Sequence, residues 1–412
     1  MKNILITSSN KKVSLIKRFK ESASHHNNIK IFTSDVKYVV TANFSDNHFI
    51  LPYDDDKSYI HTLLNVCMSN KIGLIVPTRD VEILNLSKYR ADFEKIGCKI
   101  LIPTDNVIKT CLNKKSFVEF CKLNDIGIPN TYDSHESYLF PMFCKPRYGS
   151  SSKDCFVAYN KSELPNDLNK YLLQEFLQWD EYSVDVFCDF ESTPISIVPR
   201  RRVEIVDGES QITIIDMNQH IIDNVKTLLE KINLVGHNVI QCFYKNGVVK
   251  FIEINLRFGG ASNASFEAGA DSTKMLLNIL NGKLVNTNVV QNDLIMQRFS
   301  DDVFPNKHYQ GKIFCVDIDG TLCSENPNLH YDYATPIQKS IDYINKLYDS
   351  GNIIKLYTAR GAASGTDWRD LTESQMKQWG VKYHELIMKK PFADYYIDNK
   401  AINIFNFVNY DN

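Results

Sequence analysis

A polar-ended apolar stretch at residues 249–260 constrains the fold more than any other part of the chain. It follows the turn signal Asn246-Gly247 and is rich in β-branched residues, which predicts a buried strand. Glu253 and Asn255 are two residues apart, so a strand places both on one face. Their oxygens, followed by Arg257, suit Mg²⁺ bound to a phosphate. An edge strand with a polar outer face explains the same spacing, and spacing alone favours that alternative.

Length and composition set the class of protein. At 412 residues we expect two or three domains, and 43% hydrophobic with 23% charged residues is typical of a globular protein. The net charge of −2 gives no support for nucleic acid or an anionic membrane as partner. No apolar run is long enough to span a membrane, and the start of the chain lacks the pattern of a signal peptide. Ten cysteines without a CxxC pair indicate reduced thiols, so we expect a cytoplasmic protein.

The first part of the chain, residues 1–104, alternates short apolar segments with helical patterns. The expected strands are 2–7, 29–33, 49–51, 74–77 and 99–102, with helices at 11–22 and 59–70. This rhythm predicts a parallel, Rossmann-like sheet. Because Thr7-Ser8-Ser9-Asn10 contains no glycine, we expect no nucleotide at the first turn. Thr78-Arg79-Asp80 either lines a cleft or forms a surface turn.

Residues with phosphate-binding chemistry follow from residue 105 onward. Lys114 opens a helix that runs to residue 124, and a strand ending near Lys145 leads into a loop with Gly149, Ser150 and Ser151. Such a loop offers backbone donors and hydroxyls to a triphosphate, but small residues are equally common in hairpin loops.

A second group of polar residues has the pattern of a nucleoside site. Glu175-Phe176-Leu177 ends a strand, and its backbone could contact a purine, with Glu181 beyond it for ribose hydroxyls. Arg202 lies on the next expected strand, where a solvated edge is the alternative. Gln241 lies on strand 238–244, whose hairpin with the opening strand places it near Glu253 and Asn255 as a third oxygen ligand.

Taken in order, these residues resemble the ATP-grasp superfamily, in particular the branch with carbamoyl-phosphate synthetase repeats and amino-acid ligases. The resemblance covers about residues 1–300 and implies a Rossmann-like domain (1–104) followed by an ATP-grasp domain (105–300). It implies ATP with Mg²⁺ or Mn²⁺ as cofactors. The implied roles are phosphate binding by Lys114, Lys145, Ser150 and Ser151, adenine and ribose binding by Glu175, Phe176, Leu177 and Glu181, metal binding by Gln241, Glu253 and Asn255, and stabilisation of an acyl phosphate by Arg202 and Arg257. The family's chemistry depends mainly on positioning and charge neutralisation.

Two features of this region bear on the expected site. Leu256 stands where the family often has proline, so we expect a different local turn. The small-residue loop 259–265 either admits a substrate carboxylate or packs tightly. Residues 301–311 have the composition of a linker.

The last part of the chain carries a second set of acidic residues. An apolar strand at 312–316 leads into Asp317-Ile318-Asp319-Gly320-Thr321, a second strand at 353–357 ends at Thr358, and a last strand is expected at 393–399. Two aspartates at a strand end can bind Mg²⁺ and place a carboxylate in line with phosphorus, and an acidic turn is the less favoured alternative.

These segments resemble small, capless haloacid-dehalogenase-like phosphatases from surface-polysaccharide gene clusters over residues 312–412. The resemblance implies Asp317 as nucleophile, Asp319 as proton donor and then base, Thr358 and Lys390 as phosphoryl-binding groups, and a metal held by Asp317, Asp319 and Asp398. Asn399 stands where the family often has a second acid, which weakens the expected metal site. Since each interval between these segments holds about one helix, no cap domain fits.

Together the motifs predict an α/β and α+β multidomain enzyme with two sites. The leading hypothesis is a ligase that joins a carboxylate to an amine through an acyl phosphate, coupled to hydrolysis of a phosphomonoester. We expect small-molecule carboxylate and amine substrates, one of them phosphorylated, and a homodimer is one assembly open to the chain. The alternatives are a phosphatase regulated by a nucleotide-binding module, and two independent activities on one chain.

Overall fold

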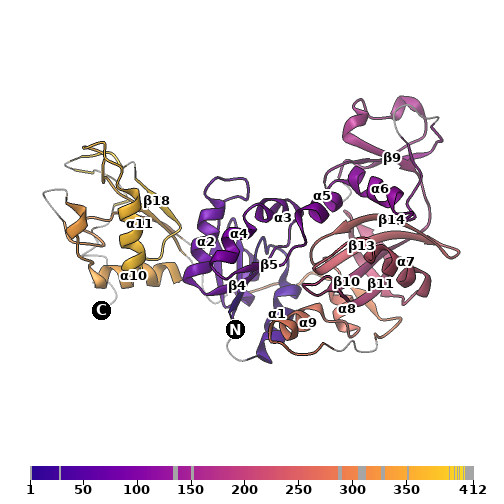
Figure 1. Cartoon of the computed structure of the whole chain (residues 1–412), viewed down its shortest axis with the longest axis horizontal. Helices are drawn as coiled ribbons and strands as arrows, with labels where there is room; N and C mark the ends of the chain where they lie inside the picture. The colour runs from indigo at the N-terminus through magenta and orange to yellow at the C-terminus, as the bar shows by residue number, and fades with distance from the viewer. Residues whose placement is uncertain are drawn as a thin grey trace. The chain divides into compact units, whose positions relative to one another are not determined.

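The chain forms two compact units that are not continuous in sequence. The computed structural model describes residues 2–26, 29–132, 138–149, 153–285, 290–304, 312–325, 330–349, 352–388, 390–393, 395, 396, 398, 400, 401 and 403. One unit comprises Met1–Ile31 with Gly73–Val303, and the other comprises Phe32–Ile72 with Phe304–Asn412 (Figure 1). The domain limits expected from the sequence at residues 104, 300 and 311 stay predictions.

The N-terminal strands form a five-stranded sheet in the order β3-β2-β1-β4-β5. Its strands are β1 (Asn3–Ile6), β2 (Ile31–Asp35), β3 (Asn47–Ile50), β4 (Ile72–Val76) and β5 (Lys99–Ile100). The associated helices are α1 (Val13–Ser24), the 3₁₀ helix η1 (Val40–Phe44), α2 (Tyr59–Ser69), α3 (Asp80–Ser87) and α4 (Arg90–Lys95). The pairs β2–β3 and β4–β5 are parallel, as predicted from the alternating pattern. Helices α3 and α4 were not predicted.

The next segment builds a small antiparallel sheet in the order β6-β9-β7-β8. It follows helices α5 (Asp105–Leu112) and α6 (Lys114–Leu123) and consists of β6 (Thr131–Tyr132), β7 (Met142–Pro146), β8 (Phe156–Ala158) and β9 (Tyr171–Glu175), with short helices η2 (Lys161–Glu163) and η3 (Leu168–Lys170). Met142, Cys144, Ala158 and Leu173 form its buried core. Strand β7 delivers Lys145, as the sequence predicted.

A six-stranded antiparallel sheet, in the order β14-β13-β10-β11-β12-β15, forms the floor of the candidate nucleotide site. Its strands are β10 (Asp180–Cys188), β11 (Pro194–Val206), β12 (Glu209–Ile215), β13 (Gly236–Lys245), β14 (Val248–Asn255) and β15 (Ile295–Gln297), with helices α7 (Gln219–Leu229), α8 (Asn263–Glu267) and α9 (Ser272–Leu280). Helix α7 lies against this sheet and buries Ile221, Val225 and Leu228 (Figure 1).

The C-terminal strands form a parallel sheet in the order β16-β17-β18. The elements are β16 (Ile313–Val316), η4 (Tyr331–Tyr333), α10 (Gln338–Asp349), β17 (Ile353–Tyr357), α11 (Arg369–Gln378) and β18 (Glu385–Ile387). The prediction of a last strand at 393–399 is wrong for the described residues of that range, which lie outside any strand. Strand β18 is instead the third strand of the sheet. Strand β18 escaped prediction because only Leu386 of its three residues is buried.

Within this second unit, α2 contacts the C-terminal part of the chain. The Thr62 hydroxyl donates to the His384 carbonyl at 3.1 Å, and the rings of Phe49 and Tyr348 have centroids 6.3 Å apart. No helix in the described ranges combines the length and the hydropathy needed to span a membrane.

Candidate functional site

The hairpin of β13 and β14 brings the three candidate metal ligands together. Gln241 stands directly opposite Glu253 in the register, and the turn residues Asn246 and Gly247 have the positive φ values of 50° and 82° that this tight connection needs. The Asn255 amide donates to the Glu253 carboxylate at 3.2 Å, so these two side chains share a face as predicted. Their role in metal binding stays a prediction.

A β-bulge on β14 sets the direction of these side chains. The register shifts between Gln241 and Cys242, which pair with Glu253 and Phe251, so Ile252 is the extra residue. As a result Ile252 and Glu253 both line the same cavity, although they are neighbours in sequence. Regular alternation from the buried Phe251 would have turned Glu253 into the core.

This cavity, here called the grasp cavity, has a volume of about 470 Å³. Its lining includes every described residue that the sequence assigned to nucleotide binding, together with two of the three candidate metal ligands: Lys114, Lys145, Glu175, Phe176, Leu177, Glu181, Arg202, Gln241 and Glu253. Ser150 and Ser151 lie outside the described residues. Asn255 and Arg257 do not line the cavity.

Two lysines approach the Glu253 end of the grasp cavity from different elements. Lys114 opens α6, donates to the Gly149 carbonyl at 2.7 Å, and lies 3.6 Å from the Glu253 carboxylate. Lys145 is 3% exposed, and its ammonium reaches the Ile252 carbonyl at 3.4 Å. Burial lowers the pKa of Lys145 to about 8, a shift that Glu253 opposes and Lys114 reinforces. The described residues therefore leave the two ammonium groups of this pair incompletely satisfied.

The opposite wall of the grasp cavity is mainly apolar, with an ordered acid at its edge. Phe176, Leu177 and Trp179 line it, and the Lys250 ammonium lies 5.2 Å from the Trp179 ring centroid. Glu175 forms an ion pair with Lys250 and accepts from the Asn130 backbone at 2.8 Å. Trp179 was not among the predicted site residues, because one aromatic residue in a loop has no distinguishing spacing.

Two predicted ligand-binding residues contact each other in this state. Glu181 is ion-paired with Arg202, whose guanidinium also donates to the Gly208 carbonyl at 2.6 Å and the Ser210 hydroxyl at 3.0 Å. Arg202 is thus anchored to the β11–β12 hairpin, while Glu181 lies beside the cavity wall.

A buried polar network supports the loop after β14. Asp185 is ion-paired with Arg200 at 2.9 Å and accepts from the hydroxyls of Ser262 and Ser265 at 2.9 and 2.6 Å. The His237 ring stacks on Phe258 with centroids 4.5 Å apart. Since both serines are buried and bonded inward, the structure favours tight packing of the loop over the carboxylate-binding alternative.

The C-terminal sheet gathers the residues named here the strand-end cluster: Asp317, Asp319, Thr358, Arg360 and Lys390. Asp317 follows β16, Thr358 follows β17, and Lys390 lies three residues after β18. The carboxyl ends of neighbouring parallel strands meet at one edge, so the side chains converge there. The Lys390 ammonium lies 2.7 Å from the Asp317 carboxylate, and the Lys390 backbone donates to the Thr358 carbonyl at 3.2 Å.

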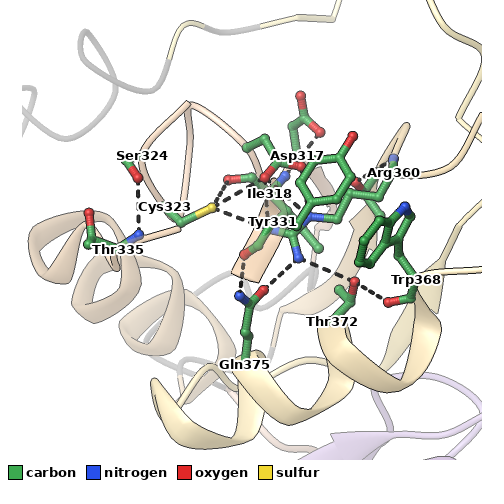
Figure 2. A network of polar contacts seen from close by, with 12 residues as sticks. Asp317, Ile318, Cys323, Ser324, Tyr331, Thr335, Arg360, Trp368, Thr372 and Gln375 are labelled. Atoms are coloured by element: carbon green, nitrogen blue, oxygen red, sulfur yellow. Dashed lines mark hydrogen bonds and ion pairs between the residues drawn. The ribbon is translucent and has the colours of Figure 1, made fainter. Parts of the chain in front are cut away.

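Arg360 is the residue of this cluster that sequence reasoning missed. Its guanidinium is buried and donates to Asp319 at 2.7 to 3.1 Å, to Gln375 at 2.6 Å and to Thr372 at 3.3 Å. It also lies 4.7 Å from the Tyr331 ring centroid. Figure 2 shows Thr372 and Gln375 of α11 directed at Arg360. These contacts hold Asp319 toward Arg360, so its predicted proton transfer requires the carboxylate to turn away.

The expected role of Asp317, Asp319 and Asp398 as metal ligands stays a prediction. Among the described residues, no group of three or more histidine, cysteine, aspartate or glutamate side chains is arranged to hold a metal ion. Asp398 is exposed and accepts from the Lys400 backbone at 2.7 Å, while Asp319 is paired with Arg360. Asn399 lies outside the described residues.

Comparison with known proteins finds family matches within the first three hundred residues. Residues 4–101 match the family model "PylC-like, N-terminal domain", and residues 167–300 match "ATP-grasp in the biosynthetic pathway with Ter operon". Among curated proteins, D-alanine–D-alanine ligase A of Bacillus cereus is 22% identical over 284 residues, which cover 57% of this chain and 90% of that protein.

Solved structures agree on the fold. The biotin carboxylase domain of Hydrogenobacter thermophilus 2-oxoglutarate carboxylase, solved with MgADP, ADP and bicarbonate, matches 71% of this chain and 73% of its own with a TM-score of 0.58 at 14% identity. Rhizobium etli pyruvate carboxylase matches 71% of this chain with the same TM-score at 12% identity, although only 30% of that chain is covered. The chain therefore has an ATP-grasp fold preceded by a PylC-like N-terminal domain.

Proposed function

We propose that the chain is an ATP-dependent ligase that joins a carboxylate to an amine in the grasp cavity. The observation that carries the proposal is the convergence of Lys114, Lys145, Gln241 and Glu253 on one cavity of nucleotide-compatible volume within an ATP-grasp fold. The similarity to D-alanine–D-alanine ligase supports the class of substrates, since that name describes the joining of two amino acids.

The residues present fit MgATP. Lys114 and Lys145 supply positive charge for phosphates, and the oxygens of Gln241, Glu253 and Asn255 are hard ligands of the kind that Mg²⁺ prefers. The metal, when bound, would neutralise phosphate charge. Phe176, Leu177 and Trp179 form a wall suited to the flat face of adenine. Glu181 would accept ribose hydroxyls.

The reaction then follows from positions and charges. One carboxylate oxygen of the acid substrate attacks the γ-phosphorus, the bond to the β–γ bridging oxygen breaks, and ADP leaves. Lys145 offsets the charge that develops on the transferred group. The amine nitrogen next attacks the acyl carbon, and phosphate departs with the oxygen that came from the acid. Arg257, whose guanidinium donates to the Asn255 side chain at 3.1 Å, would steady the acyl phosphate.

The test is ADP release by the full chain against a matrix of acids and amines. Release that requires both partners, and that Glu253→Gln abolishes, is the expected result. Glu163→Gln is a matched control, because Glu163 is exposed and lies outside the cavity lining. ADP release that is indifferent to every acid and amine would overturn the proposal.

The strand-end cluster supports a second proposed activity, hydrolysis of a phosphomonoester. Asp317 would attack phosphorus and form an aspartyl phosphate as the alcohol leaves, and water would then release phosphate. Two contacts support this role. The Lys390 ammonium lies close to the Asp317 carboxylate, and the Lys390 backbone donates to the Thr358 carbonyl. No step is assigned to a metal here, because the described carboxylates do not form a metal site.

A further inference from the structure

Lys12 lies within electrostatic range of two arginines from distant segments of the first compact unit. Lys12 precedes α1, Arg257 follows β14 by two residues, and Arg298 directly follows β15. Lys12 interacts electrostatically with both arginines. The Arg298 guanidinium lies so close to Gly260 that a Cβ there would be only 2.5 Å from one of its nitrogens. A side chain at residue 260 would therefore displace Arg298.

The charges of this group are only partly balanced by the protein. Arg257 pairs with Asp80 at 3.1 Å, and Arg298 pairs with Glu209 at 2.5 Å. The Lys12 ammonium has no hydrogen bond or ion pair to any part of the chain that the structure describes, although the Lys12 backbone bonds to Ser9 and Ile16. Two carboxylates thus face three cations, and Lys12 is the cation left over.

The environment of Lys12 makes this surplus costly without an anion. Burial lowers the pKa of Lys12 to about 8, and the charges of Arg257 and Arg298 act in the same direction, against Glu209 and Asp80. The ammonium is therefore mostly charged at pH 7 but poorly compensated. An anion bound nearby would restore the usual balance.

Helix α1 adds positive potential at the same place. Lys12 is its N-cap, makes no capping hydrogen bond with its side chain, and no acidic residue lies in the first turn. The helix has twelve residues, so its dipole and first-turn amides favour an anion at this end.

The group also adjoins the proposed reaction centre. Arg257 donates to the Asn255 side chain at 3.1 Å, and Asn255 donates to Glu253 at 3.2 Å. An acid substrate whose reacting carboxylate lies near Arg257 can extend toward Lys12 and Arg298.

We propose that Lys12, Arg298 and the start of α1 form an anion subsite for a second negatively charged group on the acid substrate, either a phosphate monoester or a carboxylate. The inference rests on the proposed ligase function, which supplies the acid. It narrows the substrate class to acids that carry two anionic groups.

The test measures binding of inorganic phosphate and of malonate to the full chain by calorimetry, with magnesium and a non-hydrolysable ATP analogue filling the grasp cavity. Lys12→Met is expected to weaken binding of the preferred anion at least tenfold. Lys17→Met, which removes one charge from the exposed side of the same helix, should change it less than twofold. A preference for phosphate identifies a monoester, and a preference for malonate identifies a dicarboxylic acid. Wild-type protein that binds neither anion, or Lys12→Met that binds both normally, would overturn the subsite.

Titration of Lys12 provides a second readout. Anion affinity should fall above pH 8 in the wild type and stay level in Lys12→Arg, because arginine remains charged. Arg257, Arg298, Asp80 and Glu209 are the charged groups that act on Lys12. A fall of equal size in both proteins would contradict the role of Lys12.

Failure of the subsite and failure of the ligase are distinguishable in the ADP-release assay. Release that needs an acid and an amine, but is equally fast for monoacids and diacids and unaffected by Lys12→Met, contradicts the subsite and leaves the ligase intact. Lys12-dependent anion binding without ADP release from any acid contradicts the ligase, and with it the assignment of the anion to an acid substrate.

Discussion

The grasp cavity and the strand-end cluster use the same kinds of side chain in different states of charge pairing. In the cavity, the Lys145 ammonium hydrogen-bonds to a backbone carbonyl and to no carboxylate among the described residues, and the Lys114 ammonium lies 3.6 Å from Glu253. In the cluster, Lys390 lies 2.7 Å from Asp317, and Arg360 holds Asp319 through three hydrogen-bond contacts. Around Lys114 and Lys145 the cavity can accept anionic phosphates without first breaking a close ion pair, whereas a phosphomonoester at the cluster must compete with Asp317 for Lys390.

This contrast predicts two separable activities, and the largest effect belongs to Asp317. Asp317→Asn should lower hydrolysis of p-nitrophenyl phosphate at least about 10³-fold, since the nucleophile is lost. ADP release should stay within about twofold of the wild type. Loss of both activities, or hydrolysis that survives the substitution, would contradict the separation.

The reciprocal substitution lies in the grasp cavity. Lys145→Met should lower acid- and amine-dependent ADP release about 10²- to 10³-fold, because it removes a buried cation beside the transferred phosphate. Lys122→Met removes an exposed charge from α6 and serves as the control. Steady-state kinetics with both substrates measure the effect, and unchanged kcat would exclude Lys145 from the site.

The contacts of Arg360 also predict an effect on the free energy of unfolding. Arg360→Met should lower the free energy of unfolding by about 2–3 kcal/mol, because it leaves Asp319, Gln375 and Thr372 without their buried partner. Arg369→Met breaks a partly exposed pair within α11 and a 3.4 Å hydrogen bond to the Leu386 carbonyl, and it should cost less than about 1 kcal/mol.

Urea unfolding can be followed by tryptophan fluorescence in a Trp179→Phe background, where Trp368 and Trp379 of the C-terminal region are the remaining reporters. Equal stability losses for the two arginine variants would show that the Arg360 network does not hold this region together.

The smallest effect concerns pH. Because the pKa of Lys145 is lowered to about 8, its charge is lost as the pH rises through that value in the nucleotide-free protein. Affinity for the non-hydrolysable ATP analogue should therefore fall about tenfold between pH 7 and 9. Lys145→Arg should flatten this dependence, since arginine stays protonated, and an equally steep fall in that variant would contradict the assignment.

Sequence patterns predicted those parts of the sites that depend on local rules. The Asn246-Gly247 turn predicted the hairpin, so the placement of Gln241 near Glu253 followed from the sequence, whereas the exact pairing of the two residues depends on the bulge. Asp317 and Thr358 were placed correctly because parallel strands align their carboxyl ends. Lys145 was placed near the end of β7 because the apolar residues before it predicted a strand.

The remaining features depend on contacts between distant segments, which periodicity does not encode. The bulge at Ile252 adds a residue that no alternation rule anticipates, yet it turns Glu253 toward the cavity. Arg360 follows Thr358 by two residues, but only the folded positions of Asp319 and α11 reveal its partners. The same holds for Lys12, whose significance comes from Arg257 and Arg298.

The central claim is that a carboxylate is activated as an acyl phosphate in the grasp cavity, and oxygen-isotope transfer tests it most directly. The full chain carrying Asp317→Asn, which silences the second source of phosphate, is incubated with MgATP, an amine and an acid labelled with ¹⁸O in its carboxylate. We predict one ¹⁸O atom in the released inorganic phosphate for each amide formed. Unlabelled phosphate, or label recovered in AMP, would contradict the account.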